Sequence, residues 1–233
     1  MKPRNDSQSP PALSAQVHDS AKAHVHGAAP YVDDLPLSEG SLHAAPVMSP
    51  VAHGRIEHID WAWAEQQEGV VAVITAQNIP GDPVLATFVH DEAIFATETT
   101  SHHGQVLGLV VAHDLLTARR VAKALPLRIS PLPAITHARD ALAQEQFVLP
   151  SVELQRGEVS NGLQASPHVL SGSLEVGGQE HFYLEGQVAY ALPQEDGQWL
   201  IHSSTQHPGE VQHWVAHALG IPLHQVQVVC RRM

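Results

Sequence analysis

The chain has 233 residues, which is long for one compact domain and suits two small ones, and 43% of its residues are apolar. Its 12 Lys and Arg stand against 24 Asp and Glu, a formal charge of −12 that opposes attraction to a phosphate backbone, so we expect no nucleic-acid partner. The single cysteine, Cys230, excludes an intrachain disulfide and a four-cysteine zinc or iron–sulfur site within the chain.

The N-terminus carries no apolar targeting signal. Residues 1–11 are polar and rich in proline, without the apolar run of a signal peptide. No stretch elsewhere approaches the roughly 20 apolar residues that cross a bilayer. We therefore expect a soluble, cytoplasmic protein without a membrane partner.

The first part of the chain mixes strand and helix patterns. Residues 1–16 form a polar tail that we expect to be disordered, and the mixed pattern extends over residues 17–143. Short apolar runs bounded by Gly, Pro or Asn are typical of buried strands. They predict strands at residues 70–75, 106–112 and 127–130.

Two helices are predicted beside these strands. Asp60 can cap a short helix over residues 61–67. Asp114 follows the second strand directly and can cap a longer helix. The apolar face of that longer helix comprises Ala118, Val121, Ala122 and Leu125.

A second α+β region follows a connector. Residues 144–166 carry few regular signals and are predicted to be the connector, and the second region extends over residues 167–233. Pro208 suits the first turn of a helix, and Gly220 suits its C-terminal end. The apolar stripe of this helix comprises Val211, Trp214, Val215, Ala218 and Leu219. Strands are predicted at residues 169–176, 188–192, 199–204 and 226–230.

The densest polar and aromatic cluster in the chain is residues 177–185, with the sequence GGQEHFYLE. Gly177 and Gly178 would let the backbone approach a bulky ligand closely, and the amide of Gln179 offers both a donor and an acceptor. A glycine turn leading into a partly buried strand explains the same residues, and the local pattern alone favours that structural interpretation.

Two other functions for this cluster are disfavoured. A Gly-Gly-Gln tripeptide also occurs in peptide release factors, but those act in a basic setting, whereas Glu175, Glu180 and Glu185 flank the motif here. Glu180 and His181 could form an acid/base pair. Neighbouring residues of a strand point to opposite faces, however, so these two side chains should diverge.

His213 and His217 lie four residues apart on the predicted helix, the spacing of a two-histidine metal site. They fall opposite the apolar stripe, and no Glu follows His213 as it does in zinc proteases. The pattern favours a solvated helix face, and we place no metal ligand there.

Six segments of the chain carry a family resemblance. They are Ala28–Leu35, Gly69–Ala76, His103–Val106, Arg156–Glu158, the cluster at 177–185 and Ser203–Gln212. Together they resemble the xanthine dehydrogenase and aldehyde oxidase family of molybdenum hydroxylases. They occur in the family's order, and the resemblance extends over the chain from about residue 17 to its last residue.

The resemblance implies an α+β fold, with an a/b hammerhead domain over residues 17–143 and the beginning of a molybdopterin-binding α+β domain over residues 167–233. It implies part of an enzyme that oxidises xanthine or hypoxanthine to urate. In this family a metal-bound hydroxide attacks the purine, and hydride passes to a sulfido ligand. The implied catalytic residue is Gln179, whose amide would hydrogen-bond an oxo ligand of molybdenum, with Gly178 beside it in cofactor binding and no residue of the chain ligating the metal.

The chain also departs from the family. The family's glycine-rich segment with Phe, Lys and Glu, its substrate-binding Arg and its general-base Glu have no counterpart in this chain. This predicts an N-terminal fragment that is inactive alone if it is truly truncated. One cysteine implies that the iron–sulfur clusters, and FAD with them, reside on a partner small subunit. A non-catalytic truncated assembly module and a fragment of an aldehyde oxidase-type enzyme remain as alternatives.

Overall fold

The computed structural model describes residues 18, 20–86 and 89–232. The predicted tail at residues 1–16 lies outside the described residues. Contacts divide the chain into two units. The larger unit comprises residues 38–183 and 213–223, and the smaller unit comprises the remaining residues at both ends and residues 184–212.

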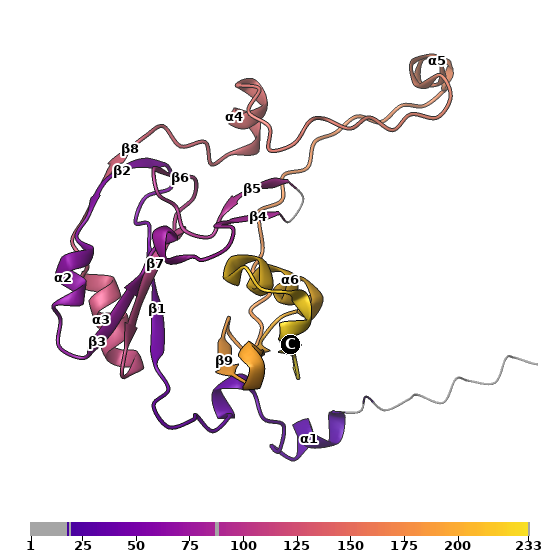
Figure 1. Ribbon diagram of the computed structural model, residues 1–233. Coiled ribbons are helices and arrows are strands. Elements are labelled where there is room, and N and C mark those ends of the chain that lie inside the picture. The colour runs from indigo at the N-terminus through magenta and orange to yellow at the C-terminus, as the bar shows by residue number, and fades with distance from the viewer. Residues whose placement is uncertain (1–17, 19, 87–88, 233) are drawn as a thin grey trace, which may run out of the picture. The chain divides into compact units, whose positions relative to one another are not determined.

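The larger unit contains most of the regular structure (Figure 1). Its strands are β1 (His43–Met48), β2 (Gly54–Ile59), β3 (Val70–Ile74), β4 (Val84–Ala86), β5 (His90–Ala93), β6 (Thr99–Thr100), β7 (Val106–Ala112) and β8 (Leu127–Pro131). Its helices are α2 (Trp61–Glu65), η2 (Ala76–Asn78), α3 (Leu115–Ala124), α4 (Ala138–Ala143) and α5 (Val159–Ala165).

The core of the larger unit lies between one sheet and one helix. The sheet has the order β1-β7-β3, and β7 runs antiparallel to both neighbours. Helix α3 packs against β1 and β7 (Figure 1). Val47, Val110 and Val121, from β1, β7 and α3, are each at most 1% exposed. An apolar middle strand covered by an amphipathic helix buries the apolar residues of both elements.

Two smaller sheets complete this unit: β6-β2-β8 and the antiparallel pair β4-β5. Gly108 in β7 allows a particularly close approach. A Cβ there would lie 2.7 Å from the carbonyl oxygen of Ile74 and 2.8 Å from the ring of Trp61. Only glycine fits at this position without a shift of the neighbouring strand or ring.

The predicted strands and helices of this region are confirmed, with ends that differ by at most two residues. Both predicted caps form. Asp60 accepts a hydrogen bond from the Trp63 N–H at 3.0 Å, and Asp114 accepts one from the Thr117 N–H at 2.8 Å. The predicted apolar face of α3 is buried in full.

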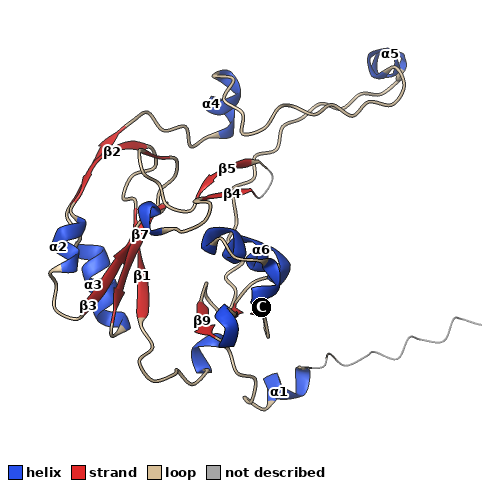
Figure 2. Ribbon diagram, viewed as in Figure 1, coloured by secondary structure: helices blue, strands red, loops and turns tan. Residues whose placement is uncertain are grey.

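Two expectations for the following segment need correction. The strand predicted at residues 169–176 does not form, because this run has no partner strand among the described residues and Leu170 is fully exposed. The range predicted as an irregular connector contains the short helix α5. Figure 2 shows α5 with loop on both of its sides.

The smaller unit is built on the sheet β11-β10-β9. Strand β9 pairs antiparallel with β10, and β11 pairs parallel with it. Ile201 and Val226 are 5% and 1% exposed and form its interior. The strands are β9 (Ala189–Pro193), β10 (Trp199–Ser203) and β11 (Val226–Val229), and the helices are α1 (Ala21–Val25), η1 (Val32–Asp34), η3 (Glu195–Gly197) and η4 (Leu223–Gln225).

Helix α6 (Pro208–Leu219) lies in sequence between β10 and β11, as a crossover between parallel strands requires. Its predicted start at Pro208 and stop at Gly220 are confirmed, and Gly220 has the left-handed φ of 66° that a helix terminator needs. The apolar stripe was predicted without Ala216, which is the residue of α6 that is buried. Within the described residues, no helix is both long and apolar enough to cross a membrane.

Candidate functional site

The cluster at residues 177–185 is an exposed loop up to Leu184. Phe182 is 93% exposed and Leu184 86% exposed, which is unusual for large apolar side chains without a partner surface. Phe182 also has a left-handed φ of 53°, a conformation that is uncommon for a bulky residue. The strand that the structural interpretation expects in this loop does not form.

Gln179 and the two glycines before it are exposed, and the glycines have free space around them. No described atom lies within 4 Å of a Cβ placed on Gly177 or Gly178. The side chain of Gln179 is exposed, and no described residue hydrogen-bonds to its amide. The amide therefore retains its donors and its acceptor for a group outside the described residues.

The suspected acid/base pair does not form. Glu180 accepts a hydrogen bond from the backbone N–H of His181 at 3.1 Å, and this bond does not involve the imidazole. The side chains of neither residue are buried. This arrangement agrees with the expectation that the two side chains do not act as a pair.

Glu185, the last residue of the cluster, belongs to the smaller unit. Its carboxylate accepts a hydrogen bond from the Val32 N–H at 2.6 Å, although the two residues are 153 positions apart. Val32 lies in Ala28–Leu35, the first segment of the family resemblance. The contact joins the first and the fifth of these segments within one unit.

The segment Ser203–Gln212 turns from β10 into α6 through side-chain hydrogen bonds. Ser204 donates to the Gly186 carbonyl at 2.8 Å, and its hydroxyl accepts the Val188 N–H at 3.0 Å. Thr205 accepts the His207 N–H at 3.0 Å just before the helix. These bonds explain why hydroxyl residues precede this helix.

A cavity of about 410 Å³ lies at this turn in the smaller unit. Arg231 and Arg232 contribute to its lining, and the Nε of Arg232 is buried with no hydrogen-bond partner among the described residues. Cys230 also lines it and donates from its Sγ to the Thr205 carbonyl at 2.9 Å. No local sequence pattern indicates this basic cavity, because the residues that line it are far apart in the chain.

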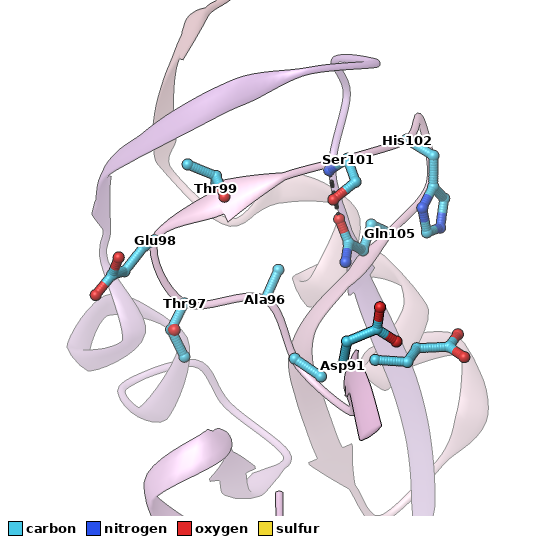
Figure 3. Close-up of a pocket in the computed structure, with 10 residues that line it drawn as sticks. Asp91, Ala96, Thr97, Glu98, Thr99, Ser101, His102 and Gln105 are labelled. Atoms are coloured by element: carbon cyan, nitrogen blue, oxygen red, sulfur yellow. Dashed lines mark hydrogen bonds between the residues drawn. The ribbon is translucent and has the colours of Figure 1, made fainter. Parts of the chain in front are cut away.

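A second cavity, of about 480 Å³, lies in the larger unit and is lined by β5, by β6 and by the loops on both sides of β6 (Figure 3). Asp91, in β5, and Glu98, just before β6, both line it. The Ser101 N–H donates to the side-chain oxygen of Gln105 at 2.7 Å. An acidic lining repels anions, so this cavity does not suit the phosphate of a pterin cofactor.

His213 and His217 are both exposed, as expected of a solvated face. His217 nevertheless has a partner that its helix does not supply. Its Nε2 lies 3.1 Å from Oδ2 of Asp82, and the Nε2 of His90 lies 2.9 Å from the same oxygen. The Val84 N–H first, and then these two imidazoles, lower the pKa of Asp82 below its ordinary value.

The residues of the cluster fit a molybdenum cofactor in one respect. A neutral, unpartnered amide can donate to an oxo ligand without adding charge near the metal. The two glycines leave space beside it. The described residues do not enclose this loop, so the remaining walls of a cofactor site would come from elsewhere.

Comparison with known families gives a consistent picture. Residues 26–133 match the model for "Aldehyde oxidase and xanthine dehydrogenase, a/b hammerhead domain", and residues 141–233 match the model for "Molybdopterin cofactor-binding domain". The two matches follow each other along the chain and together cover 201 of its 233 residues.

Curated relatives and solved structures agree with this. The chain is 39% identical to "Xanthine dehydrogenase 1" of Arabidopsis thaliana over 226 residues and 38% identical to "Nicotinate hydroxylase hnxS" of Emericella nidulans over 222 residues. These matches cover 94% and 93% of the chain, which spans 16% of the length of each relative.

Among solved structures, the aldehyde oxidoreductase of Desulfovibrio gigas is similar in fold, with a TM-score of 0.81 and 26% identity over 91% of this chain and 26% of that one. The fold, the order of the motifs and both domain matches lead to the same family. The chain belongs to the xanthine dehydrogenase and aldehyde oxidase family, and it carries an a/b hammerhead domain followed by the start of a molybdopterin cofactor-binding domain.

Proposed function

We propose that this chain is part of a molybdenum hydroxylase that oxidises purines, xanthine and hypoxanthine, to urate. The observation that carries the proposal is the free amide of Gln179, exposed beside two open glycines in the stretch that matches the cofactor-binding domain. Identity of 39% to a plant xanthine dehydrogenase favours a purine as the substrate.

Gln179 is the proposed contact to the cofactor, and Gly178 leaves room for the cofactor next to it. The molybdenum cofactor, when bound, supplies the redox chemistry. The amide of Gln179 donates a hydrogen bond to the cofactor and holds its orientation without introducing a charge. Phe182 and Leu184, which are exposed in this chain, would pack against further polypeptide of the complete enzyme.

The proposed partner is a separate small subunit that carries iron–sulfur clusters and FAD. A chain with one cysteine cannot supply the four thiolates that such a cluster takes. Electrons removed from the purine would then leave through that partner.

One observation supports a second substrate class as the alternative. The 38% identity to a nicotinate hydroxylase is nearly equal to the identity to the plant enzyme, so another electron-poor heteroaromatic ring, or an aldehyde, is the alternative substrate. The remaining alternative is a non-catalytic assembly module.

A substrate panel on the complete enzyme tests the proposal. The measurement is kcat/KM for xanthine, hypoxanthine, nicotinate and an aromatic aldehyde, with molybdenum content determined on the same preparation. We expect the two purines to have the highest values. A higher value for nicotinate or the aldehyde would overturn the purine assignment, and a complex that assembles fully but holds no molybdenum would support the assembly module instead.

A further inference from the structure

We propose that Asp82, His90 and His217 form a zinc site on the larger unit, apart from the molybdenum chemistry of the family. One ligand atom from each of the three residues lies within 4.8 Å of those of the other two. The three residues come from three segments: the loop before β4, the first residue of β5 and the last turns of α6. His217 lies 135 residues from Asp82 in the sequence.

The carboxylate of Asp82 is held in place before any ion binds. Its Oδ1 accepts the Val84 N–H at 2.8 Å, a short-range bond typical of an aspartate turn. This bond leaves Oδ2 directed at both imidazoles. The side chain of Asp82 is 33% exposed and those of the histidines 55% and 56%, so an ion can reach all three from solvent.

The backbone fixes two of the three ligands relative to each other. The Asp82 N–H donates to the His217 carbonyl at 3.1 Å, and the Gly81 N–H donates to the Ala218 carbonyl at 2.9 Å. A Cβ on Gly81 would overlap the carbonyl oxygen of His217 and lie 2.6 Å from the Gly220 nitrogen. Glycine at position 81 is therefore what allows the loop to reach the end of α6.

The third ligand is fixed by strand pairing. His90 pairs with Ala86 across the β4-β5 ladder, which begins two residues after Asp82. The hairpin thus returns the imidazole of His90 towards the carboxylate, at 2.9 Å. Secondary structure therefore positions each of the three ligands.

Two imidazole nitrogens and one carboxylate oxygen are a donor set that zinc prefers, whereas magnesium and calcium take oxygen ligands. Ligands at about 2.0–2.1 Å from a tetrahedral zinc lie roughly 3.3 Å apart. The two oxygen-to-nitrogen separations of 2.9 and 3.1 Å need to widen by only a few tenths of an ångström. Without the ion, the same contacts are hydrogen bonds from the imidazoles to the carboxylate.

Zinc titration of the full chain, followed by calorimetry and by thermal unfolding, tests the site. We expect one zinc ion per chain at this site, a higher unfolding midpoint with zinc, and reversal of that increase by EDTA, because an ion that binds only the folded state stabilises it. Magnesium should neither bind nor raise the midpoint.

Variants separate this site from adventitious binding to the other histidines among the chain's 18. His90→Gln, His217→Gln and Asp82→Asn should each weaken zinc binding by at least about tenfold, the lower end of the losses seen when residues supporting a metal site are changed. Asp82→Asn retains an acceptor for the Val84 N–H, so this variant remains informative if the histidine variants do not fold.

The matched control is His213→Gln, which removes an exposed histidine one helical turn away from His217 and outside the cluster. We expect it to bind zinc as the unaltered chain does. The proposal is overturned if the folded chain does not bind zinc, or if Asp82→Asn binds it with unchanged affinity.

Discussion

At the scale of single residues, Asp114 holds the start of α3 through one charged cap. The Thr117 N–H, followed by the Thr117 hydroxyl, lowers the pKa of Asp114 below its ordinary value of 3.8. A lowered pKa in the folded state means that the cap stabilises the fold above pH 3.8, and that this contribution is lost as the pH falls through the folded-state pKa.

We therefore expect Asp114→Ala to lower the unfolding midpoint at pH 7, and the difference from the unaltered chain to shrink below pH 3.8. Urea unfolding at neutral and acidic pH measures both effects. Glu153→Ala removes an exposed carboxylate from a loop and should leave the midpoint unchanged at pH 7. If Asp114→Ala lowered the unfolding midpoint by the same amount at both pH values, the role of the ionised cap would be contradicted.

At the scale of elements, the sheet β1-β7-β3 and helix α3 provide the stability of the larger unit. Val110 is 0% exposed in the middle strand. Val110→Ala should lower the free energy of unfolding by about 2 kcal/mol, because it removes two methyl groups and leaves a cavity.

The control for this prediction is Val71→Ala in β3. Val71 is 45% exposed, so its truncation should cost less than about 0.5 kcal/mol. Denaturant unfolding of both variants gives the comparison. Equal costs at the two positions would show that strand propensity, and not burial, determines the effect.

The local sequence pattern was sufficient to predict β3, β7 and α3 of this core, but not β1. β7 and α3 were predictable because an unbroken apolar run and a capped apolar stripe each identify one element. β1 and β2 were not predicted, since Pro46 interrupts the first and polar residues alternate through the second. The run at 169–176 has a strand-like composition, but composition cannot supply a partner strand.

The two candidate sites also differ in whether the sequence alone could predict them. Gln179 was accessible from sequence because its motif is contiguous and resembles a known family. The Asp82–His217 contact was not, since 135 positions separate the two residues and only the folded chain brings them together. His217 alone indicates no more than a solvated helix face.

At the scale of the whole molecule, the chain spans 16% of the length of its curated relatives, and the loop at residues 177–184 is exposed in the part that the structure describes. The exposed apolar residues of that loop and the free amide of Gln179 have a common explanation if further polypeptide and the cofactor cover them in the complete enzyme.

The most direct test is the turnover per bound molybdenum of the complete enzyme with Gln179→Ala, compared with Gln164→Ala, which truncates an exposed glutamine in α5. We predict that Gln179→Ala assembles with its full molybdenum content but that its kcat per molybdenum falls about 10- to 100-fold, as expected for the loss of a hydrogen bond that orients a metal centre. Gln164→Ala should retain full turnover. An unchanged kcat per molybdenum in Gln179→Ala would contradict the assignment of this amide to the cofactor.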